Sequence, residues 1–388
     1  MAGAEFTALE MIDRLVAFDT TSRNSNLELI DFVADYLAGH GIDSTRFFDD
    51  DGGKANLFAS LGPAEPGGVV LSGHTDVVPV DGQAWDTDPF TVVRNNGKLY
   101  GRGTSDMKSF IAIALALVPE FKAHGLAVPL HLALSYDEEI GCLGVDRMIE
   151  GIAAAGIEPQ IVIVGEPTGM RVANAHKGIY SFRTLVTGHE AHSSATNIGV
   201  NAVMTAARLV AFLGDLAEEM KGRAKPESGF EPPYTSVHVG TIDGGTALNI
   251  IPRECRFQWE FRLFPGADED EILNRFIEYS ENLEPAMKAV AEHTGIHTIP
   301  RSRVPGLEPE VASLAEQLVM TLTGDNRALK VSYGTEAGKF QRAGASTVIC
   351  GPGHIVQAHK PNEFIDVAQV EDCEAFMRRL MDRLRQPL

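Results

Sequence analysis

The 388-residue sequence has few features of a secreted, membrane-bound or disulfide-stabilised protein. Its four cysteines lie far apart, at positions 142, 255, 350 and 373, and form no CxxC pair. This spacing argues against a disulfide framework and fits the reduced thiols of a cytoplasm. No apolar run is long enough to cross a bilayer, and the N-terminus shows no basic segment followed by an apolar one. We therefore expect a cytoplasmic protein without a membrane segment.

Positive charge is also scarce. There are 33 lysines and arginines against 53 aspartates and glutamates, which gives a formal net charge of −20. Such a surface repels nucleic acid and anionic lipid, so neither is expected as a partner. The length exceeds what one ordinary core accommodates and predicts two domains.

Several catalytic motifs are absent as well. The sequence has neither the GxxxxGK[ST] motif of a phosphate-binding loop nor the GxSxG motif of a serine hydrolase. Gly101 and Gly103 begin like a dinucleotide-binding fingerprint, but Asp106 occupies its third glycine position. A carboxylate there would repel a pyrophosphate, which argues against a nucleotide-dependent oxidoreductase.

Runs of valine, isoleucine and leucine alternate with helical patterns in the first part of the chain, including one long helix predicted up to Gly125. Such strands are typical of a mostly parallel sheet covered by helices. From residue 179 the order becomes strand, helix, strand, strand, helix, strand, which predicts a ferredoxin-like unit. We therefore predict an α/β catalytic domain formed by residues 1–178 and 304–388. An α+β domain of residues 179–303 is inserted into it.

Acidic and imidazole side chains stand at or shortly after the ends of four predicted strands and just before the long helix. These residues are His74, Asp106, Glu138, Glu139, Glu166 and His359. Taken singly, Asp106 could be a helix N-cap and His359 a surface-loop histidine. Because the carboxyl ends of parallel strands meet at one edge of a sheet, the whole set is expected to converge. Burying it without a cation would be costly, which predicts two divalent ions bridged by one carboxylate.

Short motifs spread along nearly the whole chain resemble those of a known family. They are "SGHTDVVP", "LYGRGTSDMKSFIA", "SYDEEIGCLGV", "VGEPT", "GHEAHSS", "NIIP" and "AHKPNE". In this order they resemble the dinuclear zinc deacylases and carboxypeptidases, which include acetylornithine deacetylase, succinyl-diaminopimelate desuccinylase, aminoacylase-1 and the glutamate carboxypeptidases. "GEPTGM" and "GTEAG" are most similar to the acetylornithine deacetylases.

The resemblance implies hydrolysis of an N-acyl amino acid, with N2-acetyl-L-ornithine in arginine biosynthesis as the leading substrate. Within the same fold, a desuccinylase, another aminoacylase and a metallo-dipeptidase or carboxypeptidase are the alternatives. A non-enzymatic binding module of this fold is the alternative from a different class, but no metal ligand or general base is missing.

The resemblance also implies a metal-ligand set. His74, Asp106 and Glu166 hold one ion, and Asp106 bridges to a second ion that Glu139 and His359 complete. Zinc is the leading metal for these ligands, and cobalt or manganese also fits them.

Two further roles follow for residues beside the ligands. Glu138 matches the general base, and Asp76 matches a carboxylate that orients His74 and fixes its tautomer. The spacing of His74 and Asp76 in an extended segment would place both on the same side. The family further implies a cis peptide bond between Asp106 and Met107.

The inserted domain resembles the lid and dimerisation domain of the family, so a homodimer is expected. His192 would reach the partner's active site and donate to the oxyanion, with the neighbouring His189 as its competitor. Asn249 and Arg262 match positions that bind substrate, and an arginine fork suits a free α-carboxylate. Glu336 is the candidate contact for the ammonium group of ornithine.

Overall fold

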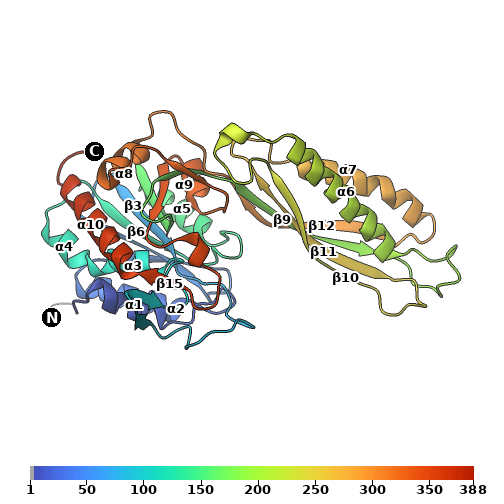
Figure 1. Cartoon of the computed structure of the whole chain (residues 1–388), viewed down its shortest axis with the longest axis horizontal. Coiled ribbons are helices and arrows are strands. Elements are labelled where there is room, and N and C mark those ends of the chain that lie inside the picture. The colour runs from blue at the N-terminus through green and yellow to red at the C-terminus, as the bar shows by residue number, and fades with distance from the viewer. Residues whose placement is uncertain (1–3) are drawn as a thin grey trace. The chain divides into compact units, whose positions relative to one another are not determined.

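The computed structural model describes residues 4–388 and divides them into two compact units (Figure 1). The first unit contains the described residues up to Ala175 together with Leu307–Lys330 and Thr335–Leu388. The second contains His176–Gly306 and the short return Val331–Gly334. The domain limits predicted at residues 179 and 303 each differ by three residues from these bounds, and the return was not predicted.

An eight-stranded sheet forms the centre of the first unit. In spatial order its strands are β1 (Ser44–Phe48), β2 (Ala55–Leu61), β6 (Leu130–Ser135), β3 (Val69–His74), β7 (Ile161–Pro167), β14 (Ser346–Gly351), β8 (Ala173–His176) and β13 (Leu329–Val331). The four central strands β6, β3, β7 and β14 pair in parallel, whereas β1, β2 and β8 join the sheet through antiparallel pairings. The predicted mostly parallel sheet is thus confirmed at its centre.

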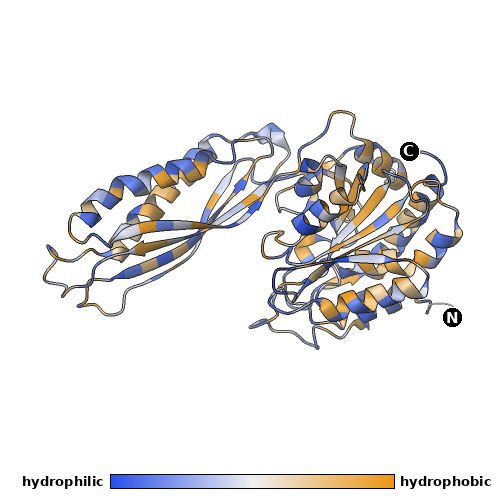
Figure 2. Cartoon of the chain, turned by 180° about the vertical axis from the view of Figure 1, so that it is seen from behind, coloured by the Kyte–Doolittle hydropathy of each residue, from blue (hydrophilic) through white to orange (hydrophobic). Residues whose placement is uncertain are grey.

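Of the central strands, β6, β3 and β7 are buried along their whole length. Figure 2 shows the strands of this sheet as largely apolar. The helices of the unit are α1 (Ala8–Val16), α2 (Leu27–Gly39), α3 (Lys108–Ala116), α4 (Val118–Ala123), α5 (Val145–Ala154), α8 (Leu314–Thr323), α9 (Ala337–Arg342) and α10 (Val367–Arg383). Across residues 4–388, no helix combines the length and apolar character that crossing a membrane requires.

The prediction of one long helix ending at Gly125 is wrong. The structure has two helices, α3 and α4, with Leu117 between them. Pro119 stands in the first turn of α4. Its ring removes a backbone donor and clashes with the preceding turn, so a continuous helix cannot pass through this position.

A small second sheet lies in the same unit and consists of β4 (Val93–Asn95), β5 (Lys98–Tyr100) and β15 (Phe364–Asp366). β4 and β5 pair as an antiparallel hairpin. The pairing of β15 with β5 joins two segments that are far apart along the chain.

The second unit has the element order β9 (Gly178–Thr187), α6 (Ala202–Gly222), β10 (Ser236–Gly244), β11 (Glu254–Leu263), α7 (Glu271–Lys288) and β12 (Gly295–Val304). Its strands form an antiparallel sheet in the order β10-β11-β9-β12, as the ferredoxin-like pattern predicted. Every second residue of β11 is buried, including Trp259. Trp259 packs against Phe182 of β9 and Phe276 of α7, so the unit has its own core.

Candidate metal centre

Three neighbouring parallel strands bring the predicted ligands to one edge of the sheet. β3 ends at His74, whose register partner is Ser135, the last residue of β6. Glu138 and Glu139 follow shortly after β6, and Glu166 lies near the end of β7. These side chains therefore converge where parallel strands place their carboxyl ends.

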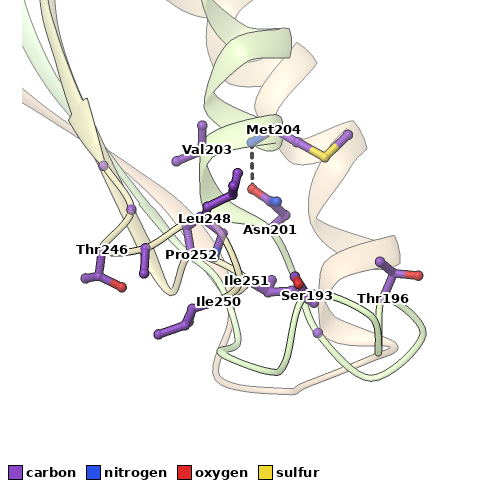
Figure 3. Close-up of a pocket in the computed structure, with 14 residues that line it drawn as sticks. Ser193, Thr196, Asn201, Val203, Met204, Thr246, Leu248, Ile250, Ile251 and Pro252 are labelled. Atoms are coloured by element: carbon purple, nitrogen blue, oxygen red, sulfur yellow. Dashed lines mark hydrogen bonds between the residues drawn. The ribbon is translucent and has the colours of Figure 1, made fainter.

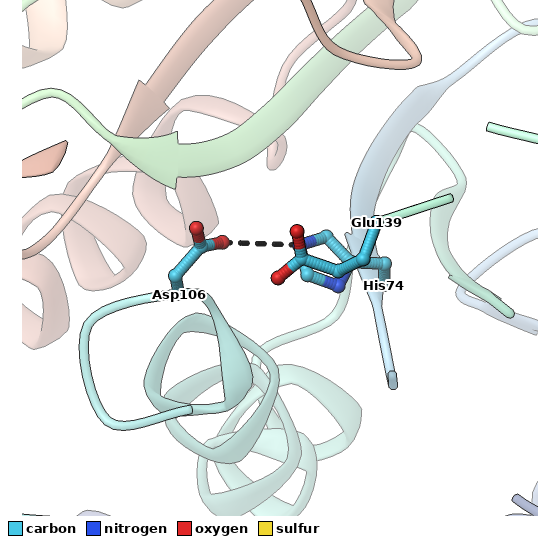
Figure 4. A group of neighbouring side chains, drawn as sticks. All are labelled: His74, Asp106 and Glu139. Carbon is cyan, nitrogen blue, oxygen red and sulfur yellow. Dashed lines mark hydrogen bonds and ion pairs between the residues drawn. The ribbon is translucent and has the colours of Figure 1, made fainter. Parts of the chain in front are cut away.

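Asp106 lies between two imidazoles. Its Oδ1 atom is 3.1 Å from Nε2 of His74, and its Oδ2 atom is 3.3 Å from Nε2 of His359. Figure 4 shows Asp106 and His74 facing one another, with Glu139 beside them. Glu166 Oε1 is 3.6 Å from His74 Nε2, and Glu139 Oε2 is 3.1 Å from His359 Nε2. The structure thus forms two groups of side chains that share the Asp106 carboxylate.

These distances suit divalent metal ions. Ligand atoms about 2.1 Å from a tetrahedral zinc lie about 3.4 Å from one another. The four distances above span 3.1 to 3.6 Å. Ligand atoms of His74, Asp106 and Glu139 all lie within 4.8 Å of one another, as do those of His74, Glu138 and Glu166, so these two triads share His74 rather than Asp106. The donor set and its spacing therefore fit a pair of ions.

The protonation equilibria of the cluster show the cost of leaving it without a cation. Burial raises the pKa of Glu138 and of Glu166 well above the usual range. Burial alone would lower the pKa of His74, but the hydrogen bond to Asp106 and the charges of Glu138 and Glu166 raise it well above its usual value. Hydrogen bonds to Asp106 and Glu139 raise the pKa of His359 to about 11. A bound cation removes the need for these protons.

The Asp76 carboxylate contacts the turn after β6. Its Oδ1 accepts the N–H of Glu138 at 3.1 Å, and its Oδ2 accepts the N–H of Glu139 at 3.2 Å. Oδ2 also accepts the hydroxyl of Ser22 at 2.7 Å. His74 Nδ1 lies 2.9 Å from the main-chain carbonyl of Asp76 and 3.6 Å from its carboxylate. The carboxylate therefore lies closer to the N–H groups of Glu138 and Glu139 than to the ring of His74, and its role in orienting His74 stays a prediction.

We expect Asp76→Ala to weaken metal binding by about 10- to 100-fold, a typical cost of losing a group that orients ligands. The variant leaves two part-buried N–H groups without their acceptor, and one of them belongs to Glu139, a predicted ligand. The measurement is zinc retention in competition with a chromophoric chelator. Asp81→Ala, which removes an exposed partner of Arg23, is the control and should behave as the parent does. Equal zinc retention in both variants would argue against this role of Asp76.

Glu138 lies beside the two groups without belonging to the predicted ligand set. Its Oε2 is 4.0 Å from His74 Nε2, and its side chain is 10% exposed. Oε1 accepts a hydrogen bond from the thiol of Cys142 at 3.3 Å. If ions were held by the two groups, a carboxylate at this place, shielded but still accessible, could exchange protons with a water between them.

Three contacts of the centre were missed by sequence reasoning. Ser22 bonds to Asp76, Lys54 pairs with Asp137 at 2.5 Å, and Cys142 bonds to Glu138. Ser22 stands in the hydroxyl-rich run "TTS", which gives only a weak signal. These contacts depend on tertiary packing and leave no local pattern.

The cis peptide bond expected between Asp106 and Met107 is present. Glu336, in contrast, differs from the open contact expected for a substrate ammonium. Its side chain is only 1% exposed, and among residues 4–388 its Oε1 has no hydrogen-bond partner. Burial raises its pKa to about 7. Its role as an ammonium contact stays a prediction.

His192 and Asn249 belong to adjoining loops of the second unit. The N–H of Ser193 donates to the carbonyl of Asn249 at 3.0 Å, and His192 forms a bridge with Ile250. The His192 ring is exposed, and its Nδ1 accepts the N–H of Ser194 at 3.3 Å. Nδ1 also lies 2.8 Å from the hydroxyl of Ser194; with Nδ1 as the acceptor of both groups, a neutral ring would carry its proton on Nε2 and could donate it.

Arg262 lies on β11 of the same unit. Its Nε and Nη2 atoms donate to the two carboxylate oxygens of Glu260 at 3.0 and 3.3 Å, and both side chains are about one-third exposed. A substrate carboxylate would have to compete with Glu260 for the guanidinium group of Arg262.

Residues 70–383 match the model of peptidase family M20/M25/M40. The chain belongs to the M20 family. An acetylornithine deacetylase of Myxococcus xanthus is 36% identical to this M20 chain over 381 residues and aligns over 95% of each protein.

Two solved M20 structures show the same fold. The metallo-carboxypeptidase Sso-CP2 of Sulfolobus solfataricus is 17% identical, with a TM-score of 0.73 over 98% of this chain and 99% of its own. The YXEP protein of Bacillus subtilis, described as a dinuclear metal-binding peptidase, is 14% identical, with a TM-score of 0.63 over 98% of each chain. The predicted family and fold class are confirmed.

Proposed function

We propose that this M20 protein is a cytoplasmic, dinuclear metal-dependent amidohydrolase. Its substrate would be N2-acetyl-L-ornithine, which it converts to L-ornithine and acetate in arginine biosynthesis. The observation that carries the proposed chemistry is the Asp106 carboxylate, which faces one imidazole with each oxygen. The proposed substrate is supported by nearly full-length similarity to an acetylornithine deacetylase. The four cysteines are free and buried, which fits a reducing compartment.

The chain's own residues account for the proton transfers. His74, Glu166, Glu139 and His359 would hold the two ions, with Asp106 as the bridge. When bound, zinc supplies Lewis acidity and a water of lowered pKa, and cobalt or manganese fits the same ligands. Glu138 takes the proton of the attacking water and returns it to the leaving amine.

The second unit would supply groups for the substrate and the oxyanion. The Nε2–H of His192 would donate to the oxyanion from the partner subunit. Arg262 would release Glu260 and bind the α-carboxylate of the substrate instead. Asn249 would contribute a polar contact next to His192. Glu336 would have to become accessible to meet the ornithine ammonium.

The homodimer we propose would form through the second unit. A pocket of about 730 Å³ lies between two segments, residues 193–204, which include the start of α6, and residues 244–252 (Figure 3). Met204 and Leu248, which line it, are 63% and 102% exposed. Ile242 on the edge strand β10 is a further exposed apolar side chain, at 52%. Apolar surface gathered in this way is typical of a protein contact, here with a second copy of the chain.

Mixing two inactive variants tests whether His192 acts across the dimer. Glu138→Ala and His192→Ala should each be inactive alone. After subunit exchange, about a quarter of the parental activity should return, because half of the dimers are mixed and one of their two sites is intact. The measurement is acetate release before and after co-refolding. Inactive mixtures with demonstrated subunit exchange would refute the trans arrangement.

A substrate panel tests the proposed function itself. The purified protein, with added zinc or cobalt, would be given N2-acetyl-L-ornithine, N-succinyl-diaminopimelate and a set of dipeptides. We expect the highest kcat/KM for acetylornithine. The similarity to Sso-CP2 makes a carboxypeptidase or dipeptidase the second candidate. A preference for dipeptides or for the succinyl substrate would overturn the proposed substrate while leaving the hydrolase in place.

A further inference from the structure

The loop that carries Asp106 belongs to no strand or helix. It runs from Gly101, just after β5, to Met107, just before α3. Asp106 faces two imidazoles, so small shifts of this loop would change both halves of the centre. Something outside the loop must therefore fix its backbone.

Glu363 binds this loop through its side chain. Its Oε1 accepts three main-chain N–H groups, those of Gly103 at 3.0 Å, Ser105 at 2.9 Å and Asp106 at 3.1 Å. Its Oε2 accepts Nη1 of Arg102 at 2.6 Å. Both Glu363 and Arg102 are 1% exposed. Converging N–H groups of this kind form an anion-binding nest, which the chain's own carboxylate fills.

The backbone of the loop is shaped for this contact. Gly103 has a φ of +85°, and a Cβ atom there would lie 3.0 Å from both Lys108 and Val77. Glycine allows the turn that aims the N–H groups at one point. A glutamine at residue 363 would have only one side-chain oxygen. That oxygen could accept the three main-chain N–H groups, but the NH₂ group would then face Arg102.

The same contacts reach the loop of His359. Glu363 lies four residues after His359, and its carbonyl accepts the N–H of Gly101 at 2.9 Å beside the β5–β15 pairing. The side chain of Gln83 donates to the carbonyl of His359 at 3.0 Å and accepts Nη2 of Arg102 at 2.6 Å. One network, buried at Glu363 and Arg102 and partly exposed at Gln83, thus joins the backbone of the Asp106 loop to that of the His359 loop.

We infer that Glu363 is a positioning residue of the dinuclear centre, holding the Asp106 loop and the His359 loop at the spacing that two metal ions require. This inference rests on the proposed metal-dependent function and extends it to a residue outside the ligand set. The competing explanation is that Glu363 and Arg102 form a buried ion pair that stabilises only the fold.

The test compares Glu363→Gln with Glu371→Gln, which changes an exposed glutamate on α10. Metal-free protein would be titrated with Co²⁺ alone, following its visible absorption, at a temperature where each variant is shown to be folded. For Glu363→Gln we expect Co²⁺ binding about 10- to 100-fold weaker and an altered spectrum, as is typical when support of the ligands is lost. In the same metal-free protein, amides of residues 101–107 should exchange with deuterium at least about 10-fold faster. Glu371→Gln should match the parent in both measurements.

A folded Glu363→Gln protein with parental Co²⁺ affinity and spectrum would overturn the inference, whatever its melting temperature. If that variant does not fold, Arg102→Gln takes its place, and the same two outcomes decide. No substrate is used, so failure to hydrolyse acetylornithine leaves the result intact. A parent protein that binds no Co²⁺ would overturn both the metal centre and this inference.

Discussion

Replacing Glu138 with alanine should lower kcat by about 10²- to 10⁴-fold while both metal ions stay bound, the usual contribution of a positioned acid–base group. The side chain lies 4.0 Å from His74 and is outside the two groups that share Asp106. Its removal takes away the proton acceptor but none of the proposed ligands. Steady-state kinetics on acetylornithine, with metal content measured on the same preparation, check both halves of this expectation.

Glu150→Ala is the matched control, because Glu150 is an exposed glutamate on α5. It should retain the kcat of the parent. Near-parental turnover in Glu138→Ala would remove Glu138 from the mechanism. Loss of metal from Glu138→Ala would instead make Glu138 a ligand, in keeping with its place beside His74 and Glu166.

Asp106→Asn should have the second large effect, lowering activity by at least about 100-fold and metal content to at most one ion per chain. Each carboxylate oxygen now faces a different imidazole. An amide offers one oxygen and turns an NH₂ group toward the other side, so it cannot bridge two cations. Metal content after gel filtration and kcat at saturating zinc are the two measurements.

Asp35→Asn, at an exposed position on α2, is the control for this substitution and should keep two ions and full activity. If Asp106→Asn also keeps two ions with parental affinity, Asp106 does not bridge them. Activity that returns with excess zinc would indicate weakened rather than lost bridging, with the affinity ratio measuring its extent.

The positions of His74 and Glu166 were predictable from the sequence because each ends a continuous apolar run. β3 and β7 are buried over their whole length, and continuous apolar runs are typical of parallel strands covered on both faces. Because parallel strands place their carboxyl ends at one edge of the sheet, His74 and Glu166 are expected at the same edge. The inserted unit was also predictable from the sequence, because apolar and polar residues alternate along β11 and every second residue of that strand is buried.

Other features had no local signal. Glu363 reaches the N–H of Gly103 across 260 positions of sequence, and only the β5–β15 pairing brings the two together. The carboxylate of Asp76 bonds to residues 62 and 63 positions away. The burial of Glu336 likewise depends on packing, since its own segment "YGTEAG" has no apolar period. Every residue except proline carries a backbone N–H group, so a sequence pattern does not indicate which of these groups a side chain will contact.

Acetate release from N2-acetyl-L-ornithine, measured before chelation, after complete metal removal and after metal is restored, tests the central claim most directly. We predict that activity falls to background in the metal-free protein and returns when two equivalents of zinc or cobalt per chain are added. Acetate release that persists after complete metal removal would contradict the two-metal mechanism, and no acetate release at any metal loading would contradict the proposed reaction.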